Sequence, residues 1–316
     1  MSVDIAVIGS FVIESAIRME RMPVIGETLV GDKYYMAPGG KGTNQAIASA
    51  RQGKKVGLVV KIGDGLFADI ALNLYKQEGI DLTGIFQTEK EKTAIGLVYF
   101  FPSGENCIGL YTGANNLLTG KEVEKAFDKF MPAKIVTAQL ESPDEAILTG
   151  FKIGKKYKAT TLLNTAPARV IDPEIFKYTD ILTPNETEAK LLVGLEPDDD
   201  SIGLSEIGRK LIELGSQAVV ITLGSKGSIV FEKGKDPLPV EAYKVDTVDT
   251  LGAGDCFSGS LCVGLSEGKS VIESVEWACV AAALQTTGHG GIAPLPKREE
   301  IEKHLKIYKK RGDQDA

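Results

Sequence analysis

Short apolar runs alternate with amphipathic stretches along most of the chain. Six runs have the length and continuous hydrophobicity of strands buried on both faces: residues 3–10, 55–63, 134–141, 159–164, 180–185 and 218–224. Between them, apolar residues recur at helical spacing in four stretches: 67–79, 142–157, 186–194 and 207–215. Strands that alternate with helices predict an α/β fold, in which helices cover both faces of a mostly parallel sheet.

Two stretches depart from this alternation. Residues 11–36 and 93–111 are extended segments with period-two patterning, and the second contains a Ser-Gly turn at 103–104. We expect them to form a small antiparallel sheet inserted into the α/β body, where it would cover a ligand bound at the strand ends as a lid. Because no repeat or long linker divides the chain, we expect residues 1–316 to form one domain.

Composition and charge exclude several classes of function. The net charge of −7 argues against non-specific binding to nucleic acid or to an anionic membrane. No window approaches the ~20 apolar residues of a membrane span, and the N-terminus lacks the basic region of a signal peptide. The four cysteines form no CxxC pair, which favours a cytoplasmic protein. With two histidines in the chain, we expect carboxylates, lysines and backbone groups to carry the chemistry.

Polar residues follow several predicted strands directly. They are Glu141, Asn164, Asn185 and Ser225. Because ligands of open parallel sheets bind beyond the carboxyl ends of the strands, these four side chains predict a site at one edge of the sheet. Asn185 also fits a helix N-cap with Glu188 as its capping-box partner, and that local role would account for both residues.

The segment PGGKGTNQA (38–46) places paired glycines and Lys41 before a helical run. Its glycines lack the GxGxxG spacing of a dinucleotide fingerprint, and no Ser or Thr follows Lys41 as a Walker A loop requires. Lys41 is either a plain surface charge or a ligand contact. The neighbouring glycines favour the second interpretation because they allow the backbone to approach a ligand closely.

In VDTLGAGDCFSGS (248–260), Asp255 follows the run Gly252-Ala253-Gly254 where an apolar helix begins. An acidic residue at a helix N-terminus is favourable for the helix dipole alone. The backbone N–H groups of such a turn also form a cradle for phosphate oxygens. A carboxylate there would repel a resting anion, but it suits a base that takes a proton from an attacking hydroxyl. The segment therefore predicts a kinase that acts on an alcohol.

These motifs together resemble the ribokinase-like, or PfkB, carbohydrate kinase family over nearly the whole chain. PGGKGTNQA is similar to its N-terminal motif and VDTLGAGDCFSG to its C-terminal motif. Between them, AQLESP (138–143), LNTAPAR (163–169), LTPNETEA (182–189) and ITLGSKG (221–227) follow in the family's order. The resemblance implies a nine-stranded α/β body with a β lid that can pair into a homodimer. It also implies transfer of the γ-phosphoryl group of ATP to a primary hydroxyl of a small sugar, with D-ribose as the leading candidate.

The resemblance implies a role for each matching residue. Asp255 is the implied general base, and Gly252, Ala253 and Gly254 the implied anion hole. Sugar contacts are implied for Glu14, Gly40, Lys41, Asn44, Glu141 and Asp255. ATP contacts are implied for Asn185, Thr222, Gly224, Ser225, Gly227 and Cys279. Asn185 and Glu188 would organise Mg²⁺, largely indirectly, and Asp249, the Leu251 carbonyl and Gly290 correspond to a site for a monovalent cation, K⁺.

Four positions depart from the family pattern. Val12 and Glu14 stand where relatives place an asparagine and an aspartate against sugar hydroxyls, and Pro294 stands where a hydroxyl residue helps to hold the cation. Cys279 replaces a polar residue expected beside the adenine. A kinase of another sugar or of a nucleoside therefore remains an alternative, as does a catalytically silent regulator that binds sugar or nucleotide on the same scaffold.

Overall fold

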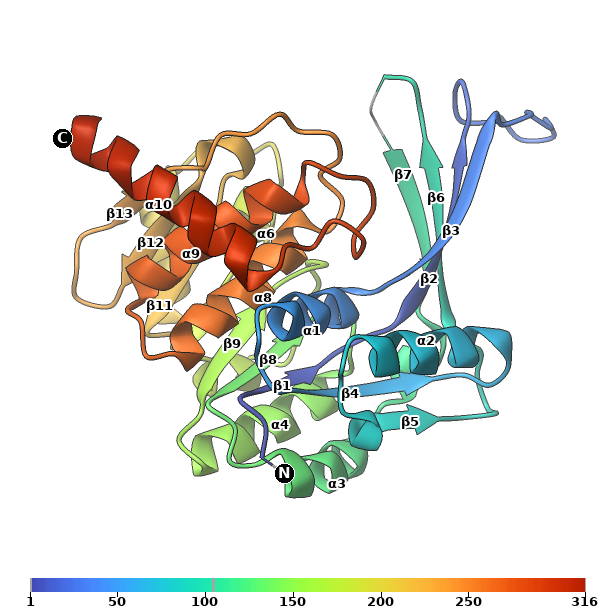
Figure 1. Ribbon diagram of the computed structural model, residues 1–316, viewed down its shortest axis with the longest axis horizontal. Coiled ribbons are helices and arrows are strands. Elements are labelled where there is room, and N and C mark those ends of the chain that lie inside the picture. Colours follow the sequence, from blue (N-terminus) through green and yellow to red (C-terminus); the bar gives the residue numbers. More distant parts are fainter. Residues whose placement is uncertain (1, 104–105, 316) are drawn as a thin grey trace.

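A nine-stranded sheet forms the centre of the molecule in the computed structural model, which describes residues 2–103 and 106–315 (Figure 1). Its strands lie in the order β13-β12-β11-β10-β9-β8-β1-β4-β5. Their bounds, in chain order, are β1 (Ile5–Ile8), β4 (Val56–Ile62), β5 (Ile85–Gln87), β8 (Ile135–Gln139), β9 (Thr160–Asn164), β10 (Ile181–Leu182), β11 (Ala218–Thr222), β12 (Ser228–Glu232) and β13 (Leu238–Val240). All pairs are parallel except β11–β12 and β12–β13.

Each of the six predicted strands is confirmed, although the run at 180–185 contributes only the two-residue strand β10. The predicted helices are also confirmed, as α2 (Leu66–Gln77), α4 (Asp144–Lys156), α6 (Glu186–Leu192) and α7 (Leu204–Glu213). The other helices are α1 (Lys41–Arg51), α3 (Gly120–Phe130), α5 (Glu174–Lys177), α8 (Ala253–Ser266), α9 (Val271–Gln285) and α10 (Arg298–Asp315). Short 3₁₀ turns lie at η1 (Leu82–Gly84), η2 (Gly113–Leu117) and η3 (Gly224–Lys226).

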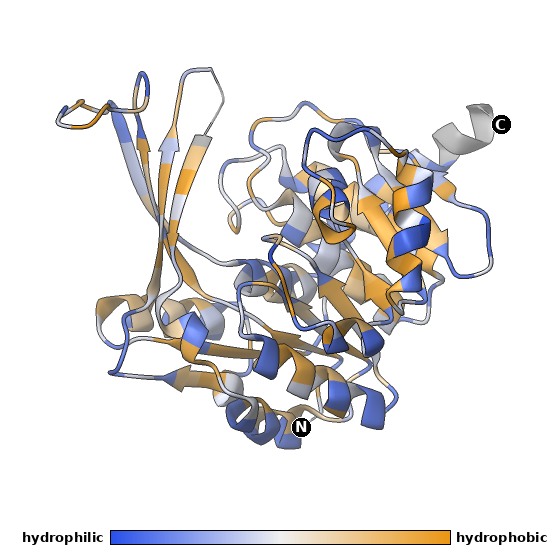
Figure 2. Cartoon of the chain, turned by 180° about the vertical axis from the view of Figure 1, so that it is seen from behind, coloured by the Kyte–Doolittle hydropathy of each residue, from blue (hydrophilic) through white to orange (hydrophobic). Residues whose placement is uncertain are grey.

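Helices cover both faces of the sheet. Successive strand residues point to opposite faces, and since both sets are apolar, both faces are buried. Ile5 and Val7 of β1 pack in the core that contains α2, α8 and α9. Ala6 and Ile8 pack in the core on the other face, against α3, α4 and α7. Figure 2 shows the result as hydrophobic strands enclosed by helices whose outer faces are hydrophilic. In the described part of the chain, no helix is both long and apolar enough to cross a membrane.

A second sheet of four strands projects from this body (Figure 1). Its order is β3 (Lys33–Gly39), β2 (Val12–Arg18), β6 (Ala94–Phe100) and β7 (Asn106–Tyr111). The pairs β2–β3 and β6–β7 are antiparallel, and a parallel contact between β2 and β6 joins them. The two stretches that depart from the βα alternation therefore form one sheet. The predicted turn at 103–104 falls partly outside the described residues.

Candidate active site

A cavity of about 220 Å³ lies at the carboxyl edge of the central sheet. Its lining comes from the ends of β9, β10 and β11 and from the first turns of α1, α6 and α8: Lys41, Asn164, Ala166, Thr183, Asn185, Glu188, Thr222, Gly252, Gly254, Asp255 and Ser258. Eight of these are predicted site residues that are scattered over more than two hundred positions of the sequence. The parallel topology brings them together because it places the strand ends on one edge.

The N-terminus of α8 faces this cavity. Its N-cap, Gly252, has a left-handed backbone with φ of 79°, and a Cβ there would approach the Gly291 Cα to 2.9 Å. The N–H of Ala253 donates to the Thr250 carbonyl at 3.2 Å. Gly254 is exposed, and a Cβ on it would meet nothing within 4 Å. The backbone at Gly254 thus borders open space, where the helix dipole also favours an anion.

Asp255 is 7% exposed, and side-chain amides from α1 hold its carboxylate. Asn44 Nδ2 donates to Oδ2 at 2.9 Å, and Gln45 Nε2 lies 3.4 Å from Oδ1. Because each carboxylate oxygen accepts more than one hydrogen bond, both oxygens keep capacity for a substrate hydroxyl. Asp255 is therefore oriented by the protein while its acceptor function stays available at the cavity.

Gln45 is a site residue that the sequence analysis missed. Its Oε1 accepts from Gln139 Nε2 at 2.6 Å, and its Nε2 also lies 3.3 Å from Asn164 Oδ1. Asn164 Nδ2 in turn donates to the Thr183 carbonyl at 2.9 Å. A signal was present, since Gln45 follows Lys41 by four residues and therefore shares its helix face. These amides connect α1 to the ends of β8 and β9.

Lys41 supplies the positive charge of the cavity, as the one lysine, arginine or histidine among the described residues that line it. The negative charge of Asp255 raises the pKa of its ammonium group, and burial opposes that shift. The backbone N–H of Lys41 donates to Glu141 Oε2 at 3.0 Å, and the Ser10 hydroxyl donates to the same oxygen. Burial raises the pKa of Glu141. The first turn of α1 thus presents one positive charge to a group of carboxylates.

Glu14 approaches the same charges from the lid strand β2. Burial, together with the negative charges of Asp255 and Glu141, raises its pKa to about 7. Val12, two residues earlier, points to the same side of the lid and is 4% exposed. At Gly40, φ is 100° and a Cβ would come within 2.9 Å of the Ser10 carbonyl oxygen, so this position requires glycine. The predicted sugar residues therefore gather between lid and body.

The predicted ATP residues divide into two groups. Thr222 ends β11 and lines the cavity, and Gly224 and Ser225 lie exposed in the turn that follows. Gly227 closes the turn with φ of 94°. Cys279 is absent from the cavity lining and packs behind this turn, where its Sγ lies 3.5 Å from Ser228 Oγ. Burial raises the pKa of this thiol to about 11, so it is an uncharged packing group.

Asn185 and Glu188 form the capping box that their spacing predicts. Asn185 Oδ1 accepts from the Glu188 N–H at 2.8 Å, and Glu188 Oε2 accepts from the Asn185 N–H at 3.0 Å. Both residues also line the cavity, so the capping role and a role at the site coexist. Among the described residues, no three His, Cys, Asp or Glu side chains cluster as metal ligands. This donor set fits Mg²⁺ that is held mainly by phosphate oxygens and water, with protein groups around it.

Asp249, Leu251 and Gly290 also lie together, as the resemblance implies. Asp249 accepts from the N–H of Leu251 and from that of Gly290, both at 2.9 Å. The carbonyl oxygens of Leu251 and Gly290 both accept from the side-chain amide of Gln285. A hydrogen-bond donor therefore stands where a cation would need both oxygens, and this donor set does not fit a monovalent cation. Pro294, in the following loop, offers no hydroxyl and packs near Gly288.

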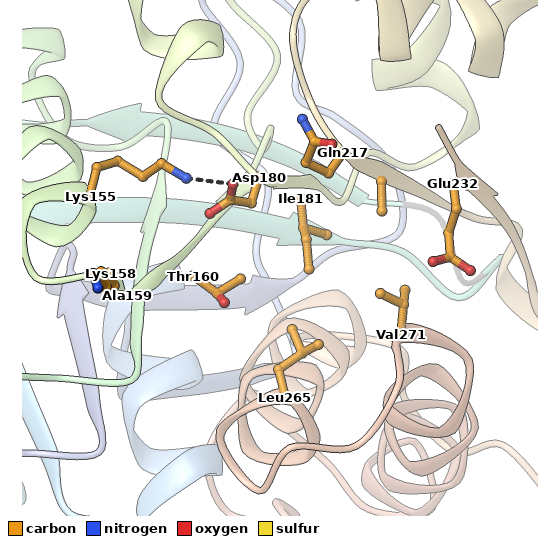
Figure 3. A pocket seen from close by; sticks show the side chains of 11 residues that line it. Lys155, Lys158, Ala159, Thr160, Asp180, Ile181, Gln217, Glu232, Leu265 and Val271 are labelled. Atoms are coloured by element: carbon orange, nitrogen blue, oxygen red, sulfur yellow. Dashed lines mark hydrogen bonds and ion pairs between the residues drawn. The ribbon is translucent and has the colours of Figure 1, made fainter. Parts of the chain in front are cut away.

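A larger cavity, of about 550 Å³, opens at the opposite edge of the sheet (Figure 3). Thr160 and Ala218, the first residues of β9 and β11, contribute to its lining. Its Asp180 is paired with Lys155, as Figure 3 shows, and accepts from the N–H of Thr161 at 2.9 Å. Glu232, the second acid of this lining, pairs with Lys235. Both acids are thus engaged by lysines, whereas Asp255 faces the smaller cavity and can accept further hydrogen bonds.

Known proteins resemble the chain over nearly its full length. It is 35% identical over 305 residues to a ribokinase of Haemophilus influenzae, covering 96% of this chain and 99% of the relative. It is 31% identical over 305 residues to a deoxyribokinase of Salmonella typhi, with the same coverage. The structure of Arabidopsis thaliana ribokinase complexed with ribose and ATP superposes with a TM-score of 0.86 at 30% identity, covering 97% of this chain and 99% of that one. Residues 3–298 match the pfkB family carbohydrate kinases, and the chain belongs to this family of ATP-dependent sugar kinases.

Proposed function

We propose that this protein transfers the γ-phosphoryl group of ATP to a primary hydroxyl of a small sugar, with D-ribose as the first candidate. The observation that carries this proposal is the placement of Asp255 beside the open N-terminus of α8, in a cavity that also contains Lys41. The names of the relatives, which include ribokinases and a structure with ribose and ATP, support ribose.

The chemistry follows from the residues at the cavity. Asp255 accepts the proton of the sugar hydroxyl as its oxygen forms a bond to the γ-phosphorus, and the bond between that phosphorus and the β,γ-bridging oxygen breaks. The backbone of Gly252, Ala253 and Gly254, with the N–H of Gly254 at the cavity, holds the charge on the transferred group. Lys41 adds positive charge on the same side. Mg²⁺, when bound, would neutralise charge on the phosphates, and Asn185 and Glu188 would hold the ion mainly through water molecules.

The sugar occupies the space between lid and body. Glu14, Lys41, Asn44 and Glu141 supply hydrogen bonds to its hydroxyls, and Gly40 allows close approach of the backbone. Val12 makes 2-deoxyribose a second candidate, because an apolar side chain cannot form the hydrogen bond that a further hydroxyl would need. The deoxyribokinase relative supports including this sugar.

ATP is placed along the turn after β11. Thr222, Gly224, Ser225 and Gly227 line its path, and Cys279 supports this turn from behind through its contact with Ser228. Potassium is not part of this proposal, because Gln285 already engages the carbonyl oxygens that the cation would use.

A panel of acceptors tests the proposal. ADP release is measured with saturating MgATP and with ribose, 2-deoxyribose, fructose, tagatose or a nucleoside. The expected result is the highest kcat/KM with ribose. A much higher value for 2-deoxyribose or another acceptor would replace the substrate assignment and leave the kinase assignment intact. Sugar binding without ADP release for every acceptor would instead identify a silent binding protein.

The quaternary arrangement and location are further parts of the proposal. The whole chain acts as one domain, with residues 11–36 and 93–111 as the lid. The lid exposes large apolar side chains on three of its strands: Tyr34, Met36, Leu97, Ile108, Leu110 and Tyr111. The strand register places Tyr34, Met36, Leu97 and Tyr111 on one face, and Ile108 and Leu110 on the face that carries Glu14. The first face favours burial against a second copy, so we expect a homodimer through the lid. The four cysteines are free thiols, in keeping with a cytoplasmic protein. Light scattering on the purified protein checks the dimer.

A further inference from the structure

Two loops meet beside the N-terminus of α8. One runs from Asp249 to Gly252 and leads into the helix, and the other follows Gln285 at the end of α9. They pack closely, since a Cβ at Gly252 would lie 2.9 Å from the Gly291 Cα. Asp249 joins them by accepting one backbone N–H from each loop, those of Leu251 and Gly290. The position of the phosphate cradle therefore depends on how these loops are held together.

The side chain of Gln285 makes a second connection between the loops. Gln285 is fully buried, and its Nε2 donates to the Leu251 carbonyl oxygen and, at 3.1 Å, to the Gly290 carbonyl oxygen. A carboxamide nitrogen carries two N–H donors, so each carbonyl receives one. The opposite orientation of the amide would set Oε1 against two carbonyl oxygens, which is unfavourable. The two carbonyls thus converge on a fixed donor that the chain itself supplies.

A monovalent cation would satisfy the same carbonyls by direct coordination, because carbonyl oxygens bind either cations or N–H donors. The two solutions exclude each other at this point, since the Gln285 nitrogen already contacts both oxygens. Asp249 accepts one backbone N–H on each oxygen, from Leu251 and from Gly290, so it ties the two loops together whichever group engages the carbonyls. A tethered amide also differs from an ion in that its occupancy does not depend on salt composition.

We propose that the Gln285 carboxamide takes the place of the monovalent cation, so that the loop bearing Leu251 and the cradle at Gly252 keep their position without potassium. Gln285 is a positioning residue, because it acts through the Leu251 carbonyl and touches no substrate. The part of this inference that concerns turnover rests on the proposed kinase function. The part that concerns stability does not.

Thermal unfolding in matched salts tests the inference. The Tm of the wild-type protein is measured in the chlorides of potassium, sodium and tetramethylammonium at equal ionic strength, and turnover is measured in parallel with ATP as its Tris salt. The wild-type Tm is expected to agree within about 1 °C among the salts, and turnover is expected to be equal. A saturable rise of either quantity with K⁺ would overturn the inference, whether or not any variant folds.

Two variants sharpen this test. Gln285→Ala removes the donor, so in tetramethylammonium its Tm should fall by about 2–4 °C and its turnover about tenfold, with K⁺ restoring both. Gln285→Glu presents an acceptor to the two carbonyls and should respond to K⁺ more strongly. Equal losses in all three salts for both variants would show a packing role only and overturn the inference.

Gln52 provides the matched control. It is also fully buried. Its Nε2 donates a hydrogen bond to Ser260 Oγ and its Oε1 accepts one from Trp277 Nε1, both at 2.7 Å. Gln52→Ala should lose stability by the same amount in every salt. If the wild-type protein released no ADP with any sugar, the proposed function would fail, and the Tm measurements would still decide on Gln285.

Discussion

The two edges of the central sheet differ in whether their polar side chains can still bind a ligand. At the amino edge, the cavity of about 550 Å³ is the larger one, but its Asp180 is engaged by Lys155 and by Thr161. At the carboxyl edge, the cavity of about 220 Å³ contains Asp255, held by two amides and still able to accept a proton. The comparison teaches that acceptor and donor groups left available, rather than volume, mark the reactive edge.

The sharpest way to break this comparison is to neutralise the acid at the carboxyl edge. Asp255→Asn should lower kcat by about 10²–10⁴-fold, the usual range for loss of a positioned general base. The fold should persist, because the amide keeps the size of the carboxylate. Steady-state kinetics and a thermal melt measure the two effects. Near-normal turnover would contradict the role of Asp255.

Gln45 tests whether orientation of that acid contributes to catalysis. Gln45→Leu removes one of the two amide donors to Asp255 and should lower kcat about tenfold, in line with the loss of a hydrogen bond to a charged group. A loss of stability with an unchanged kcat would show that Gln45 only packs.

Glu14 sharpens the comparison through pH, since its pKa is raised to about 7 from 4.5. Between pH 4.5 and about pH 7, folded Glu14 holds a proton that the unfolded chain has released. The free energy of unfolding therefore falls as the pH rises through this window. Glu14→Gln removes the effect. Its Tm relative to wild type should therefore increase by about 2–4 °C between pH values below and above the window.

A matched control for this measurement is Glu20→Gln, because Glu20 lies exposed just beyond β2. That variant should differ from wild type by the same small amount at every pH. If the Tm difference between Glu14→Gln and wild type were also constant with pH, the pKa of Glu14 would not be raised.

The smallest effect on activity is expected at the amino edge. Asp180→Asn weakens the pairing with Lys155 and places an amide against the Thr161 N–H, and it should cost about 1–2 kcal/mol of unfolding free energy. The value of kcat should stay unchanged. Urea unfolding and steady-state kinetics check this. A fall in kcat beyond that explained by unfolding would make the two edges functionally alike.

Much of the fold was predictable from local sequence. Continuous apolar runs predicted the buried parallel strands because both of their faces lie under helices. The edge strands β5 and β13 were missed, since each has three residues and β13 is largely exposed. Strand β12, which lies between β11 and β13, was missed as well. The segments 11–36 and 93–111 were predicted as extended, but only pairing across the chain decides that β2 lies parallel to β6.

The site was predictable where one short segment contains the chemistry. The turn Gly252-Ala253-Gly254 with Asp255, and the capping box of Asn185 and Glu188, depend on neighbours within four residues. Cys279 shows the limit, because its helical position says nothing of its contact with Ser228. The shared face of Lys41 and Gln45 was visible in the sequence, but the partner of Gln45 was not.

The sequence by itself determined which segments become strands and helices, where the phosphate cradle begins, and which acid stands next to it. These properties depend on hydrophobic period and on turn chemistry, which act over a few residues. Only the tertiary structure decided that Gln45 reaches Asp255, that Glu14 loses its charge near neutral pH, and that Gln285 bridges two carbonyls. Each of these depends on desolvation and on contacts between residues far apart in the chain. Both desolvation and such contacts arise only when the sheet has assembled.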